Sequence, residues 1–161
     1  YMPFNPFDAE VEGEGLANGL NARHTFGRFL DEALFRGRTF ADLARAGHAT
    51  VVVNASDVAA AVPFVFNPAT FDALCADLAR LPLSEAVAAS AAFPVVFAPI
   101  TIAAPERRCD YEEPGWLRAA RSSPGAHPAM RVYAEAMARY ADAEAVREVR
   151  LLDGGMTDSF G

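Results

Sequence analysis

Apolar and polar positions alternate along this chain in short blocks, and glycines and prolines separate the blocks. Over residues 24–35 the apolar side chains recur at helical spacing, which predicts an amphipathic helix that Gly37 ends. A second, shorter helix is predicted from Thr39, which has an aspartate three positions on, to Gly47. Residues 1–20 have no period and are rich in Gly, Pro and acidic groups, so we expect a flexible arm or linker there.

Two β-branched runs in the next part of the chain predict strands. The run Ala49–Ala55 is almost wholly apolar and is bounded by turn residues, which is the pattern of a strand covered on both faces in a parallel sheet. Val62–Phe66 predicts a strand at a sheet edge or in a hairpin, because Pro63 has no backbone N–H to donate to a neighbour.

Helices are predicted on either side of residue 80. Asn67 followed by a proline is a typical helix start, and we expect this helix to run through Leu78. The next helix, Ser84–Ala92, consists almost wholly of small residues, and Pro94 ends it. Pro99–Ile102 then predicts a further strand.

The last third of the chain predicts an insertion, a helix and a strand. Residues 104–127 mix charge, Pro, Gly and Ser, which indicates a surface insertion with one or two helical turns around Trp116. A helix is predicted over 128–140 and a strand over 146–152. Because helices alternate with apolar strands throughout, the pattern indicates an α/β fold.

Composition limits the classes of partner. With 161 residues, of which 52% are hydrophobic, the chain can form one domain with a substantial core. The formal net charge of −7 argues against a nucleic-acid partner and against docking on anionic lipid by charge alone. The longest apolar run, residues 86–102, is interrupted by prolines and hydroxyl residues, so no transmembrane segment is predicted.

Residues that could bind a metal or react as thiols are few and scattered. Cys75 and Cys109 lack Cys-x-x-Cys spacing and have no histidine close by, which disfavours zinc. They leave a disulfide open, and two ordinary thiols are the default expectation. His24, His48 and His127 have no common spacing, so we expect surface or structural roles for them.

Two further sets of residues have an alternative functional interpretation. Asp153 and Asp158 could share a metal, but two carboxylates without further ligands are better explained as solvated loop acids, and we expect no metal. Several phenylalanines could line a pocket for an acyl chain, although packing in an aromatic core is the default expectation. They are Phe64, Phe66, Phe71, Phe93 and Phe97.

The tripeptide Asp153-Gly-Gly follows the last predicted strand directly. In open α/β sheets, sites form at the carboxyl ends of strands, and two glycines let the backbone turn tightly and approach a partner closely. An aspartate at this place can accept a hydrogen bond from a hydroxyl and hold that hydroxyl in attacking geometry. Taken alone, the tripeptide is a weak signal of a site, and a tight turn whose aspartate caps its own backbone is the default expectation.

Two motifs in this order resemble those of bacterial patatin-like phospholipases. Ala89-Ser-Ala-Ala-Phe-Pro94 ends a small-residue helix, and Asp153-Gly-Gly follows a strand. The segments Asn54–Asp57 and Phe71–Asp77 precede them in the matching order, so that the resemblance covers roughly residues 25–161. It implies a three-layer α/β/α sandwich with a central, mostly parallel sheet. Residues 21–161 would be part of such a domain, truncated at both ends, with 104–127 as a surface insertion.

The resemblance also implies a chemistry, the hydrolysis of phospholipid or related lipid acyl esters by a serine–aspartate dyad without a metal or organic cofactor. The serine of such a dyad lies in a G-x-S-x-G turn, and Asp153 matches the acid that activates it. Backbone N–H groups of a glycine-rich loop stabilise the oxyanion. This sequence contains neither that turn nor that loop. We therefore expect both upstream of residue 1, and we expect this chain to be inactive alone.

Two other interpretations stay open. The chain could be a non-catalytic module that binds lipid or another protein on the same scaffold, and contact with a membrane surface fits either function. It could also be an unrelated α/β protein with a coincidental resemblance. A sheet in which Val53 and Leu151 do not lie on neighbouring or near-neighbouring parallel strands would favour this last interpretation.

Overall fold

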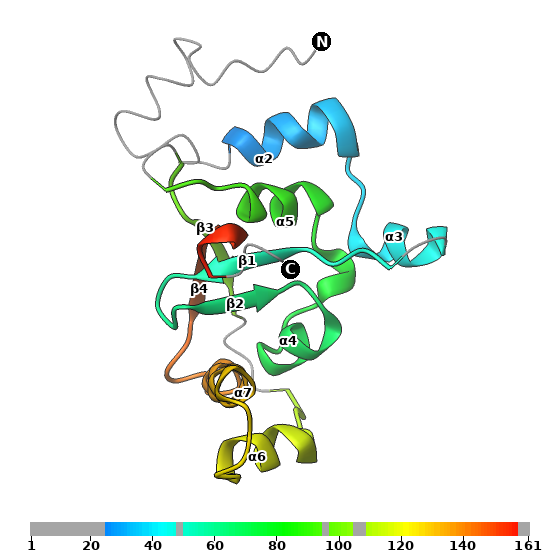
Figure 1. Ribbon diagram of the computed structural model, residues 1–161. Helices are drawn as coiled ribbons and strands as arrows, with labels where there is room; N and C mark the ends of the chain where they lie inside the picture. The colour runs from blue at the N-terminus through cyan, green and yellow to red at the C-terminus, as the bar shows by residue number, and fades with distance from the viewer. Residues whose placement is uncertain (1–24, 48–49, 95–96, 105–108, 158–161) are drawn as a thin grey trace.

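The computed structural model describes residues 25–47, 50–94, 97–104 and 109–157, and these form one antiparallel sheet packed with helices (Figure 1). The sheet order is β2-β1-β4-β3. The strands are β1 (Asn54–Asp57), β2 (Val62–Val65), β3 (Ile100–Ala103) and β4 (Glu148–Asp153). The predicted arm, residues 1–20, lies outside the described residues.

The prediction of a central, mostly parallel sheet in a three-layer sandwich is wrong. Each neighbouring pair of strands in the described sheet is antiparallel. The turn at residues 58–61 reverses the chain between β1 and β2, and β4 runs opposite to both β1 and β3. Val53 directly precedes β1, and Leu151 lies on the neighbouring β4, but the two strands are antiparallel, which favours the interpretation that the resemblance is coincidental. Apolar runs indicate where strands are buried, whereas their direction depends on where the chain re-enters the sheet.

Helices lie on both sides of the sheet. In Figure 1, α5 lies between the sheet and α2, whereas α4 and α7 lie on the opposite side, with α6 beyond α7. The helices are α2 (Thr25–Leu30), α3 (Phe40–Ala46), α4 (Pro68–Ala73), α5 (Leu83–Ser90), α6 (Gly115–Ser122) and α7 (Pro128–Tyr140). Short turns of other helix types are η2 (Asp31–Phe35), η3 (Leu78–Arg80) and η4 (Gly154–Met156).

The predicted helix boundaries are largely confirmed, because local hydrogen bonds fix them. The backbone N–H of Thr39 donates to the Asp42 carboxylate at 2.9 Å, and Gly47 ends α3 in the left-handed region with φ of 65°. Asn67 accepts a hydrogen bond from the backbone of Thr70 at 2.9 Å to begin α4. The helical turns expected around Trp116 are present as α6.

Two predicted elements differ from the structure. The strand predicted over Ala49–Ala55 begins only at Asn54, and Val51 and Val52 before it are 49% and 69% exposed. The helix predicted through Leu78 ends at Ala73, because Cys75 adopts a left-handed backbone conformation with φ of 54°.

The core is centred on Phe64 of the edge strand β2. Its ring makes edge contacts with Phe66, Phe71 and Tyr140, which brings β2, α4 and α7 together. The aromatic core expected for Phe64, Phe66 and Phe71 is therefore confirmed. Phe97 stacks on Phe26, in contrast to Phe93, which is 59% exposed.

The small-residue helix α5 packs closely against the sheet and α2. Ala86, Ala88 and Ala89 have no exposed surface, because α5 is covered by β1 and β4 on one side and by α2 on the other. Ala88 also lies opposite Gly27 of α2, where an added Cβ would lie 3.8 Å from the Ala88 side chain. Alanines at these positions let the backbones approach, as the sequence predicts.

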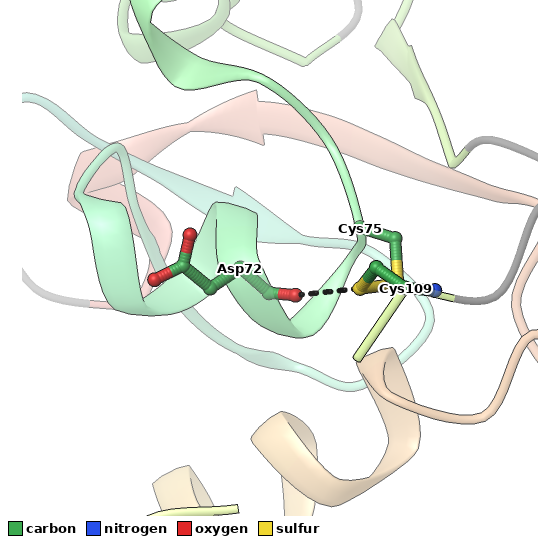
Figure 2. The surroundings of a disulfide bond; sticks show 3 residues. All are labelled: Asp72, Cys75 and Cys109. Carbon is green, nitrogen blue, oxygen red and sulfur yellow. Dashed lines mark hydrogen bonds between the residues drawn. A yellow bond between two sulfur atoms is a disulfide. The ribbon is translucent and has the colours of Figure 1, made fainter. Parts of the chain in front are cut away.

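A disulfide joins Cys75, after α4, to Cys109, before α6 (Figure 2). The expectation of two ordinary thiols is therefore wrong. The Cys109 sulfur lies 3.6 Å from the carbonyl oxygen of Asp72, and a dashed line joins the two atoms in Figure 2. Since a disulfide sulfur has no proton, this interaction becomes a hydrogen bond only when Cys109 is a thiol. The bond ties the segment that leads into α6 to the helix that covers β2.

Loss of this disulfide should lower the free energy of unfolding. The bond closes a loop across a sequence separation of 34. Closing a loop of that size lowers the entropy of the unfolded chain and so raises its free energy by about 3–4 kcal/mol. Urea unfolding of the double variant Cys75→Ala/Cys109→Ala should show this decrease. Dithiothreitol should lower the free energy of unfolding of the native chain but not that of the variant. Equal stability of the oxidised and reduced native chain would contradict the assignment.

Candidate functional site

Three elements meet at Asp153, the last residue of β4. Its backbone pairs with Ala55 of β1, and its N–H donates to the carbonyl oxygen of Ala92, just beyond α5, at 3.0 Å. The following residue, Gly154, is buried against Asn54. The structure therefore places Asp153 at the carboxyl end of a strand and beside the small-residue helix, as the sequence predicts.

Gly154 is required by the close approach of two backbones. A Cβ at this position would lie 2.7 Å from the carbonyl oxygen of Asn54 and 2.9 Å from its side-chain Oδ1. A carbonyl oxygen of a paired strand cannot move away without shifting β1. Only glycine therefore fits between β4 and β1 in this turn.

The Asp153 carboxylate caps its own turn. Its Oδ1 accepts a hydrogen bond from the backbone N–H of Gly155 at 2.8 Å, which begins the η4 turn. The residue is half-buried. In the described part of the chain, no hydroxyl group contacts this carboxylate. The capping alternative is therefore present, and the role of Asp153 as an activating base stays a prediction.

Ser56 holds the same turn from β1. Its hydroxyl donates to the backbone carbonyl of Asp153 at 2.7 Å and lies 2.8 Å from the hydroxyl of Thr157. Because Ser56 has one proton to donate, Thr157 is the donor in the second bond. Ser56 is 3% exposed, so this hydroxyl positions the turn rather than attacks a substrate. Sequence reasoning missed this role, for which the only signal is the place of Ser56 after an apolar run.

A second buried pair, also missed from the sequence, lies next to Ser56. Asp57 is 2% exposed and accepts hydrogen bonds from the backbone of Ala59 and Ala60 and from the hydroxyl of Tyr140 at 2.8 Å. Burial, followed by the nearby Asp57 charge, raises the pKa of the Tyr140 phenol well above its ordinary value of 10.0. Tyr140 therefore stays protonated and acts as a structural donor from α7 to β1.

An apolar groove of about 810 Å³ lies beside the turn; we call it the turn groove. Its lining includes three exposed apolar side chains, Val58 (48%), Val132 (44%) and Met156 (56%). Leu152 and Thr157 also contribute to it, so it reaches both sides of Asp153 in sequence. Asp153 itself is not part of the lining.

The remaining candidate residues do not gather at this site. The Nδ1 of His127 accepts a hydrogen bond from the backbone of Ala129 at 3.3 Å, which caps α7 and confirms a structural role. His24, His48 and Asp158 lie outside the described residues. Within the described ranges, no group of three or more His, Cys, Asp or Glu side chains is placed to hold a metal ion.

Comparisons of this chain with protein-family models, with curated proteins and with solved structures find no match. In the parts of the chain that the structure describes, no helix has the length and apolar character needed to cross a membrane. The interpretation of the site therefore rests on its own geometry.

Replacing Gly154 by alanine should destabilise the fold. The added methyl group would overlap the backbone of Asn54, and overpacking of this kind costs about 1–3 kcal/mol. Gly115→Ala is the matched control, since a Cβ there has no neighbour within 4 Å. Thermal unfolding should show a lower midpoint than that of the native chain for Gly154→Ala but not for Gly115→Ala. Equal midpoints for both variants would contradict the close packing.

Replacing Tyr140 by phenylalanine should alter stability in two ways. At neutral pH the buried Asp57 carboxylate loses a donor, which costs about 1–3 kcal/mol. Since the folded pKa of Tyr140 lies above its unfolded value, its contribution is complete below pH 10 and is lost as the pH rises further. The sequence has no lysine, so few other groups titrate in this range. Urea unfolding between pH 9 and about 11 should show a shallower decline for the variant than for the native chain. Parallel declines would contradict the pKa assignment.

Proposed function

We propose that Asp153 is the acid of a serine–aspartate dyad that hydrolyses lipid acyl esters. The serine belongs to a G-x-S-x-G turn, which this sequence does not contain. The observation that carries the proposal is the geometry of the Asp153 carboxylate. The backbone of Asp153 is held at a strand end between β1 and the residue that follows α5, and the carboxylate uses only Oδ1, which accepts the hydrogen bond from Gly155.

The second carboxylate oxygen is the chemically useful one. Asp153 Oδ2 makes no hydrogen bond to any described residue, so it can accept the proton of an incoming serine hydroxyl. The serine oxygen then attacks the ester carbonyl, and the alcohol leaves with the proton that Asp153 holds. Asp153 next takes a proton from the water that attacks the acyl-serine and returns this proton to the serine oxygen as the fatty acid is released. The cap from Gly155 would keep the carboxylate oriented through both steps. This support is local, and it does not include the parallel sheet that the resemblance implied.

The variant Asp153→Asn separates the proposed chemistry from the structural cap. Asparagine retains Oδ1 as an acceptor for Gly155 but cannot take a proton, so the fold should persist. In the natural gene product that includes this chain, hydrolysis of a short-chain p-nitrophenyl ester should fall by about 10²–10⁴-fold. The control Asp110→Asn, at an exposed carboxylate, should leave the rate unchanged. Retained activity in Asp153→Asn would show that Asp153 is not the base.

The isolated chain provides the complementary measurement. Because it lacks the G-x-S-x-G serine, it should show no turnover above background with the same ester. Turnover that Asp153→Ala removes and that a serine-reactive inhibitor does not affect would contradict the dyad.

A second candidate function, non-catalytic lipid binding, is favoured by the turn groove. Its apolar lining includes Val58, Val132 and Met156, all of which are exposed. In that function the groove would hold an acyl chain and Asp153 would serve only as a cap. Binding of a fluorescent fatty acid that Val132→Ser weakens, together with unchanged ester hydrolysis in Asp153→Asn, would select this function over the dyad.

A further inference from the structure

An apolar surface lies beside the segment that leads into β1 and includes side chains of that segment. Val51 and Val52 are 49% and 69% exposed, and they border a groove of about 890 Å³. Phe40, Leu43 and Leu78 contribute further apolar side chains to it. We call Val51, Val52 and this groove the valine surface. An apolar run exposed beside a groove marks an interaction site more often than scattered surface residues do.

The backbone of residues 50–53 has groups that can form further hydrogen bonds. The carbonyl oxygen of Val53 accepts from Phe66 at 2.9 Å, which anchors the end of the segment beside β2. On its other side β4 stops at Asp153, which pairs with Ala55 and then turns away. Within the described chain, no backbone hydrogen bond joins residues 50–52 to another residue.

The sequence of the segment favours a strand. Thr50, Val51, Val52 and Val53 are all β-branched, and such residues stabilise extended, half-buried backbone. An extended peptide can add to backbone of this kind, with its main chain providing affinity and its alternate side chains providing specificity.

The charge around the groove selects the partner. Asp72 and Asp77 line it, and none of its lining residues is basic. Arg45 on the neighbouring α3 is paired with Asp42 at 2.7 Å, and Arg80 at the end of η3 is not part of the lining. A second copy of this chain would bring the same carboxylates and a formal charge of −7, which opposes self-association.

We propose that the valine surface binds an extended segment of another polypeptide with alternating apolar and basic side chains. The segment adds as a strand along residues 50–53 and its apolar side chains enter the groove. Its basic side chains start from the opposite face and, being long, reach around the strand to the exposed carboxylates of Asp72 and Asp77. This interaction does not depend on the hydrolytic function of Asp153.

Two fluorescein-labelled hexapeptides test the proposal against the whole chain, one alternating arginine with valine and one alternating glutamate with valine. Fluorescence anisotropy should show that the arginine peptide binds more tightly than the glutamate peptide, by about tenfold or more. Hydrogen exchange should slow at one of the two amides of Val51 and Val52 when the arginine peptide is added, because neighbouring amides of a strand point to opposite sides and the added strand pairs only one of them.

Matched variants locate the binding surface. Val52→Ser should weaken binding of the arginine peptide by about tenfold, whereas Val132→Ser, at another exposed valine, on α7, should leave the affinity for this peptide unchanged. Asp72→Asn should weaken it as well, in contrast to Glu135→Gln on α7. Because all four side chains are exposed, the variants should fold, which circular dichroism checks.

Three results would overturn the proposal. The first is no binding of the arginine peptide up to about 1 mM, the weak end of specific affinity. The second is equal weakening by Val52→Ser and Val132→Ser. The third is a dimer in light scattering that Val52→Ser disperses, since the occupant would then be a second copy.

Discussion

The contact between Gly154 and the backbone of Asn54 is the constraint on which the candidate site depends. Because glycine has no Cβ, β4 can turn directly against β1 at this point. The Ser56 hydroxyl and the Ala92 carbonyl then hold the backbone of Asp153 from two sides. The carboxylate therefore extends from a strand end, which positions it more firmly than a flexible loop or an exposed turn would.

Local features of the fold could be predicted from the sequence, because they depend on neighbouring residues. Caps at Thr39 and Asn67 and the edge position of Pro63 are of this kind. Strand direction was predicted wrongly, since it depends on how long connections return to the sheet. The Cys75–Cys109 bond and the Tyr140–Asp57 pair join residues 34 and 83 positions apart, and no local pattern reveals them.

The candidate site was predicted only in part, for the same reason. Asp153 was identified because a strand followed by Asp-Gly-Gly is visible in the sequence. The supporting contact from Ser56 spans 97 positions and became evident only in the structure. Val51 and Val52 were expected in a buried strand and are instead exposed, and that difference leads to the proposed interaction surface. The two proposals depend on different residues, Asp153 in one and Val51, Val52 and their groove in the other, so each can fail without the other.

The central claim concerns one carboxylate and one hydroxyl. A crystal structure of the natural gene product that includes this chain would measure the distance between Asp153 Oδ2 and the nearest serine Oγ. The dyad requires a serine of a G-x-S-x-G turn within about 2.6–3.2 Å of that oxygen. An Asp153 carboxylate that faces bulk water, with every serine hydroxyl beyond hydrogen-bonding distance, would contradict the account.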